Sequence, residues 1–182
     1  NNGKKMCEYT SLDGDIEGEQ KYFNMAGEPI LTLVYESGVL KQYIKLDASG
    51  AVAQRVDVSA ETADVVSQYA NGKTAMQLKF NKGILEGSFV VNGPDGKPQY
   101  TAQYANNSYN GERLEYYAGG KLYKKEQFKN GKYHGKQEYF AEDGKPLFVA
   151  NYSEGDLHGD FLQYTNGVLA LTKKYDTDEL VY

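Results

Sequence analysis

The sequence predicts an all-β protein, an elongated antiparallel β-meander built from about seven hairpin repeats of 24 residues. Its 182 residues include 17 Tyr, 7 Phe and 20 Gly, with no Trp and only 4 Pro. This composition is typical of strands and turns, because aromatic rings suit a pleated, half-buried surface. Glycines recur at a constant interval, and the segments between them are short and lack helical periodicity.

The repeat is most regular in the second half of the chain. Gly87, Gly111, Gly135 and Gly159 are each separated from the next by 24 residues. Aromatic residues keep the same interval in two series, which we expect to anchor each unit. The series that follow these glycines are Tyr104, Phe128, Tyr152 and Tyr175, and Tyr116, Phe140 and Tyr164.

The repeat predicts one domain over residues 1–182, with a capping strand in 1–17, degenerate repeats in 18–86 and regular repeats in 87–182. Gly18 begins a clear unit, whereas the units near Lys41 and Ala63 are incomplete. The stretch 56–68 is the least regular. Ser59 is an acceptable helix N-cap, but we favour a degenerate strand and loop because the surrounding glycines stay near register.

Turn and strand patterns predict the arrangement inside each unit. EDGK, KNGK and AGGK contain dipeptides that supply positive φ in tight hairpins, so consecutive strands should be antiparallel. Alternation places Phe148, Ala150 and Tyr152 on one side of a strand, which we interpret as the core face. The opposite face is expected to be polar and to carry scattered tyrosines.

Charge and hydropathy disfavour several partners. The formal charge of -5 and the pI near 5.1 argue against nucleic acid and anionic membranes. No apolar run approaches the roughly 20 residues that span a bilayer, so we expect a soluble protein. The chain begins with Asn rather than Met, and export with removal of a signal peptide is favoured over a cytoplasmic location.

Two consecutive units carry a resemblance to a known family: GERLEYYAGGKLYKKEQFKNGKYHG and GKQEYFAEDGKPLFVANYSEGDLHG. They resemble MORN-variant repeats, as found in YwqK-type bacterial proteins, many of which are described as antitoxins or immunity proteins. The likeness covers about residues 14–175. It implies an antiparallel β-meander and a protein-binding role, although a repeat motif is architectural and occurs in proteins of unrelated function.

The sequence shows no constellation typical of catalysis or metal binding. His134 and His158 occupy the same slot in neighbouring units, which places their Cα atoms roughly 10 Å apart, whereas ligands of one zinc ion lie about 2 Å from it. Cys7 is the only cysteine, which excludes an intramolecular disulfide, and NGKYHGK lacks the context of a phosphate loop. We therefore expect no enzyme activity, cofactor or metal.

The predicted function is a repeat scaffold that binds another protein along a sheet face or edge. Tyrosines on the opposite face suit an interface because each ring has a polar tip, and the two histidines could belong to its rim. Carbohydrate or cell-envelope glycan binding by exposed tyrosines is the alternative, and an enzyme built on residues 56–68 is a third reading. The candidate binding residues are Tyr22, Tyr117, Tyr123, Tyr139, His134 and His158.

Overall fold

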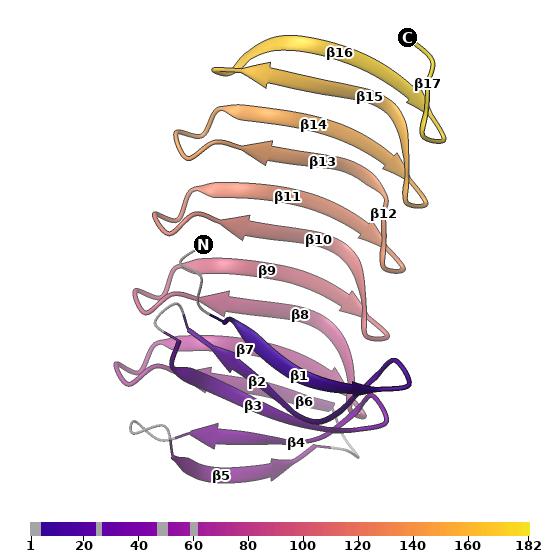
Figure 1. Cartoon of the computed structure of the whole chain (residues 1–182). Coiled ribbons are helices and arrows are strands. Elements are labelled where there is room, and N and C mark those ends of the chain that lie inside the picture. The colour runs from indigo at the N-terminus through magenta and orange to yellow at the C-terminus, as the bar shows by residue number, and fades with distance from the viewer. Residues whose placement is uncertain (1–4, 25–26, 47–50, 59–61) are drawn as a thin grey trace. The chain divides into compact units, whose positions relative to one another are not determined.

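The computed structural model describes residues 5–24, 27–46, 51–58 and 62–182, and every regular element in them is a β-strand (Figure 1). Neighbouring strands pair antiparallel along the chain, which confirms the predicted all-β meander of hairpins. The chain divides into two compact units, 1–97 and 98–182. That all 182 residues form one domain stays a prediction.

The first unit contains two groups of strands. Five strands form one sheet in chain order: β1 (Cys7–Leu12), β2 (Asp15–Phe23), β3 (Pro29–Glu36), β4 (Val39–Leu46) and β5 (Val52–Asp57). Three more pair consecutively: β6 (Thr62–Gln68), β7 (Thr74–Asn81) and β8 (Ile84–Asn92). Sheet pairing stops between β5 and β6, so the meander is divided between two sheets.

The stretch 56–68 is where this break occurs. Val56 and Asp57 end β5, and β6 begins at Thr62, so the described part of the stretch is extended as favoured from the sequence. The possible helix start at Ser59 lies outside the described residues.

The two groups of strands in the first unit pack against each other. The backbone N–H of Leu40 donates a 2.8 Å hydrogen bond to the carbonyl of Gly83, and the rings of Tyr22 and Phe89 have centroids 6.0 Å apart. Leu33 and Phe80 are fully buried. The largest buried apolar side chains of the described residues therefore lie in this unit, where two layers exclude water from the core.

Within the second unit the strands form an antiparallel meander (Figure 1). Each strand pairs with its chain neighbours, except that β13 passes the two-residue β12, and both pair with β11. Its strands are β9 (Pro98–Ala105), β10 (Ser108–Tyr116), β11 (Leu122–Lys129), β12 (Lys132–Tyr133), β13 (Gly135–Phe140), β14 (Pro146–Ser153), β15 (Asp156–Thr165), β16 (Val168–Asp176) and β17 (Glu179–Leu180).

Two kinds of turn alternate between the strands. Asn130 and Gly131 both have positive φ, 50° and 79°, which is the conformation of a two-residue hairpin turn. At the other end of the hairpins the loop is longer. There Gly144 N–H donates to the Ala141 carbonyl at 2.8 Å, and Asp143 accepts from the Lys145 N–H at 3.0 Å. These local bonds confirm the predicted hairpins and explain the glycines.

The tight contact at Gly83 makes this residue a test of the layered packing. A Cβ at Gly83 would lie 2.4 Å from the Leu40 carbonyl oxygen and 2.5 Å from Val39 Cγ1, and φ is +77°. Gly72 has nearly the same φ, +79°, but open space around it. We expect Gly72→Ala to lower the free energy of unfolding by about 1–2 kcal/mol through backbone strain. Gly83→Ala should lower the free energy of unfolding by roughly 1–3 kcal/mol more than Gly72→Ala, because its Cβ also clashes with the neighbouring layer.

Chemical denaturation of the two variants measures this difference. Equal losses would contradict the close packing of the two layers at Gly83, because Gly72→Ala carries the same backbone strain without a contact.

Candidate binding face

One side of the second unit's sheet carries most of its rings, and we call it the aromatic face. Cross-strand partners lie on the same side of a sheet, which defines the face from the register. Arg113 pairs with Glu126, Gln137 with Ala150, and Ala150 with Phe161. This face includes Phe148, Ala150 and Tyr152, as the sequence predicts.

A first row of rings runs across the strands of the aromatic face. The rings are tilted by 35–43° relative to their neighbours, with centroids 4.7–5.1 Å apart. Such contacts add to the stability from buried area. The row consists of Tyr104, Tyr109, Phe128, Tyr133 and Tyr152. The predicted Tyr104 series thus anchors the units, but its ring neighbours are Tyr109 and Tyr133, and not members of the Tyr116 series.

A second row of rings lies toward the longer hairpin loops. Tyr139 stacks on Phe148 at 4.1 Å, Tyr123 lies 6.0 Å from Tyr139, and Tyr117 lies 5.1 Å from Tyr123. Glu115 pairs with Lys124 and Tyr116 with Leu122, which leaves Tyr123 as the extra residue of a β-bulge. The bulge lets the ring of Tyr123, the second residue of β11, reach its neighbours in this row.

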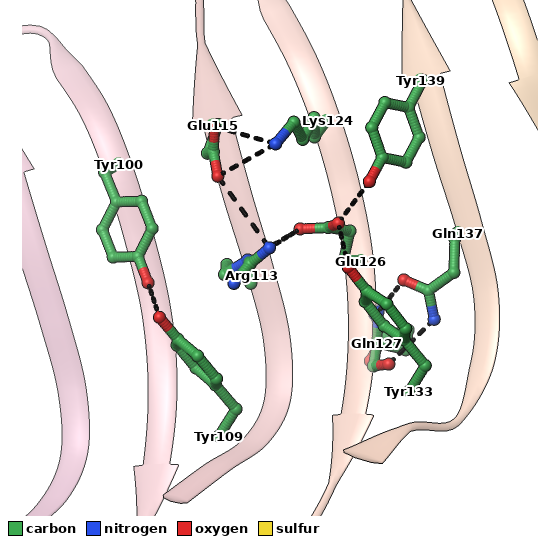
Figure 2. A network of polar contacts seen from close by, with 10 residues as sticks. All are labelled: Tyr100, Tyr109, Arg113, Glu115, Lys124, Glu126, Gln127, Tyr133, Gln137 and Tyr139. Atoms are coloured by element: carbon green, nitrogen blue, oxygen red, sulfur yellow. Dashed lines mark hydrogen bonds and ion pairs between the residues drawn. The ribbon is translucent and has the colours of Figure 1, made fainter. Parts of the chain in front are cut away.

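A buried carboxylate links the two rows (Figure 2). Glu126 is 0% exposed. Its Oε2 accepts from Arg113 Nε at 2.7 Å, and its Oε1 accepts from the hydroxyls of Tyr133 at 3.0 Å and Tyr139 at 2.6 Å. Each carboxylate oxygen is therefore hydrogen-bonded, which a buried charge requires.

The Arg113 guanidinium makes cation–π contacts with two rings in addition to its ion pairs. Its guanidinium carbon lies 5.0 Å from the Tyr109 ring centroid and 4.9 Å from that of Phe128, a geometry in which a cation is attracted to the ring face. Glu115 approaches the same guanidinium at 4.0 Å and also pairs with Lys124 at 3.4 Å. The charged groups thus order the rings around them.

Burial raises the pKa of the Tyr139 phenol, and its hydrogen bond to the Glu126 carboxylate raises it further. Both causes favour the neutral hydroxyl over phenolate. The raised pKa means that Tyr139 stays a hydrogen-bond donor above the usual titration range of tyrosine.

The structure brings together three of the predicted binding residues. Tyr117, Tyr123 and Tyr139 are half-buried neighbours in the second ring row. The expectation that Tyr139 lies on the polar face is wrong, because Tyr139 pairs with Phe148 on the aromatic face. The β13–β14 register shifts at a bulge between Tyr139 and Phe140, so alternation counted from Phe140 does not assign the side of Tyr139.

Tyr22, the remaining predicted tyrosine, belongs to the first unit. It pairs with Leu31, a buried core residue, and its ring contacts Phe89. Its expected place on the polar face is therefore wrong as well, because its half-buried ring lies on the side of β2 that packs against Phe89.

The two histidines lie next to two-residue turns and contact different carboxylates. His134 Nδ1 is 3.5 Å from Glu154, and His158 Nδ1 is 3.1 Å from Asp176. Both side chains are exposed. The pattern repeats from one unit to the next, and each histidine faces an acid of the following turn.

Arg113 and Glu126 were not singled out from the sequence, although the repeat contains a signal for them. Glu126 occupies the slot of Ala102 and Ala150, 24 residues to either side, and Arg113 occupies the slot of Gln137 and Phe161. A charged residue at a repeat position where neighbouring units have Ala or Phe indicates that the charge has a specific partner.

No group of three or more His, Cys, Asp or Glu side chains in the described part of the chain could hold a metal ion. No helix there is long and apolar enough to cross a membrane.

Fold and face together define an all-β protein of repeated hairpins whose sheet presents ordered aromatic rows. A family model described as MORN repeat variant matches residues 109–130 and 133–154. These matches cover the β10–β11 hairpin and the β13–β14 hairpin. The chain therefore contains two adjacent repeats of this kind, and it is a repeat scaffold. No curated protein matches the chain.

Proposed function

We propose that this chain is a non-enzymatic scaffold that binds another protein through the aromatic face of residues 98–182. The observation that carries the proposal is the pair of half-buried ring rows held in place by Glu126. Rigid aromatic side chains with polar tips contribute large contact areas at little conformational cost, and they are enriched where protein interfaces gain most of their affinity.

A comparison between the two units supports this proposal. Met76, Leu78 and Phe80 are almost completely buried in the layered first unit. Advancing 48 residues along the repeat, the same slots hold Lys124, Glu126 and Phe128. These repeat positions thus hold apolar side chains in the two-layer core of the first unit. In the sheet of the second unit the same positions hold charged and aromatic side chains. A mixture of charged and aromatic side chains is typical of transient protein interfaces, because the unbound surface must also be stable in water.

The geometry of the rings favours a protein partner over a glycan. Sugar binding by aromatic residues uses ring faces that are open to the ligand. Here Tyr139 and Phe148 stack on each other at 4.1 Å, and Tyr109 lies between Tyr104 and Phe128. Each of these rings is therefore largely covered on its face by a neighbouring ring. The ring edges and the hydroxyl groups remain for contact with a partner.

An antitoxin or immunity role, which the family resemblance implies, is the specific form of this function that we propose. The partner would then be a toxin whose activity the bound scaffold blocks. Expressing the identified partner alone and together with the chain tests this form. Toxicity that co-expression removes would support it, whereas a harmless partner would restrict the proposal to protein binding.

The test of the binding face uses Tyr117→Ala and Tyr123→Ala. A partner is captured on the immobilised chain, identified by mass spectrometry, purified, and titrated against each variant. We expect roughly a tenfold or greater loss of affinity for each substitution at an interface centre. Tyr9→Ala is the matched control, because Tyr9 is 60% exposed and lies on β1.

Unchanged thermal unfolding of the variants shows that the fold is retained. Equal affinities of the variants and the Tyr9 control would contradict binding at this face. Selective hits on a glycan array that both substitutions abolish would replace the protein partner with a carbohydrate.

A further inference from the structure

The aromatic face of the second unit has a counterpart in the first unit. Phe80 pairs with Leu85 in the β7–β8 hairpin, and 48 residues further along the chain Phe128 pairs with Tyr133. The turns that follow Phe80 and Phe128 agree as well, because each contains two consecutive residues of positive φ. Equal register and equal turns place these residues on the same face of the repeat.

In the first unit this face is covered by a second sheet. Val65 and Phe80 are 0% exposed on it. Strands β3 and β4 of the sheet β1–β5 lie against β6, and β3 also lies against β7. The ring of Tyr22 on β2 lies 6.0 Å from that of Phe89, which pairs with Leu78 on the covered face. This face of the repeat therefore accepts a β-sheet as its second layer.

The corresponding face of the second unit has no second layer within that unit. All strands of residues 98–182 pair edge to edge in one sheet. The rings of Tyr109, Tyr123, Tyr133 and Tyr139 are half-buried there. Ring contacts and hydrogen bonds to Glu126 hold them in place, which reduces the side-chain entropy that is lost when a partner covers them.

Charge indicates what kind of sheet would cover the aromatic face. The positions of Val65, Met76 and Leu78 in the first unit correspond to those of Arg113, Lys124 and Glu126 in the second. These charges are paired within the sheet, because Arg113 lies 2.6 Å from Glu126 and Lys124 lies 3.4 Å from Glu115. A covering face with charges of its own would bury them without partners, at a cost in free energy. An uncharged face fits better.

We propose that the aromatic face binds a β-sheet of the partner protein, which packs over β10–β14 as the sheet β1–β5 packs over β6–β8. The contacting face of the partner carries apolar side chains over the rings and hydroxyl or amide groups over the ion pairs. Stacked sheets lie about 10 Å apart and interdigitate their side chains. The inference rests on the protein-binding function proposed above, and it names the class of partner surface.

Photocrosslinking at single positions of the full chain tests this proposal. The photoreactive residue p-benzoylphenylalanine replaces Tyr123 on β11 or Tyr152 on β14, both on the aromatic face. The matched control replaces Lys125, which lies on β11 but pairs with Leu114 on the opposite face. Each variant is irradiated in an extract of the source cells, and crosslinked peptides are identified by mass spectrometry. Thermal unfolding checks that the variants keep the fold.

We expect one protein to be crosslinked from both aromatic-face positions and lost from the Lys125 control. Its crosslinked residues should lie on neighbouring strands of one sheet, and those on a single strand should be two residues apart, because alternate side chains share a face. Crosslinks to a loop, or to residues three and four apart on a helix, would overturn the sheet inference and leave binding at the aromatic face intact.

Two other results would also contradict the proposal. Crosslinks only to a second copy of this chain would assign the aromatic face to self-association. Equal crosslinking from Lys125 and from Tyr123, or no crosslinked protein from either aromatic-face position, would contradict the binding face itself. That result refutes the proposed function as well, and so differs from a crosslink to a helix or a loop.

Discussion

Glu126→Ala is expected to lower the free energy of unfolding of the second unit by about 3–5 kcal/mol, the usual cost of removing one partner of a buried ion pair. The substitution leaves the half-buried Arg113 guanidinium without its 2.6 Å contact to the carboxylate. It also removes the acceptor of the Tyr133 and Tyr139 hydroxyls. Three donors thus lose their partner in a region with little water to replace it.

Glu154→Ala is the matched control for this prediction. Glu154 also accepts from a cation, Lys129 at 3.1 Å, but both side chains are more than half exposed. Solvent screening reduces such a pair to a small contribution. Denaturant unfolding of both variants, followed by circular dichroism and tyrosine fluorescence, should therefore separate them clearly. Similar small losses for the two would show that the Glu126 network does not stabilise the sheet.

Phe80→Ala should produce a loss of similar size in the first unit, about 3–5 kcal/mol. Phe80 is 0% exposed. It lies with Leu78 on the side of β7 that packs against the sheet of β1–β5. Removal of its ring leaves a cavity between two layers whose strands are held by their own hydrogen bonds. The layers cannot close this cavity without disturbing neighbouring contacts, so the cost exceeds the loss of buried area alone.

Tyr9→Ala provides the comparison in the same unit. Its ring is 60% exposed on β1, so we expect a loss of only about 0.5 kcal/mol or less. Equilibrium unfolding in denaturant measures both variants. A loss below about 1 kcal/mol for Phe80→Ala would contradict a tightly packed two-layer core.

Much of the candidate site follows from the sequence once the repeat is recognised. Tyr117 and Tyr123 were two of the four tyrosines expected on the polar face, and their rings are neighbours in the second ring row. Tyr139 belongs to the same cluster although its face was assigned incorrectly, because alternation counts residues and a bulge adds one. Sequence spacing also marks Glu126 as an exception among alanines. It does not show that Arg113 is its partner, since that depends on the register of β10 against β11.

The strands, the turns and the repeat positions can be predicted from the sequence alone. These features are local: glycine and asparagine supply positive φ, and alternation assigns sides over a few residues. Three features depend on the tertiary structure: pairing stops between β5 and β6, the Tyr22 ring contacts Phe89, and Glu126 joins two ring rows. The physical reason is that layer packing and buried ion pairs join residues distant in the chain. Their free energy depends on water being excluded from both partners at once.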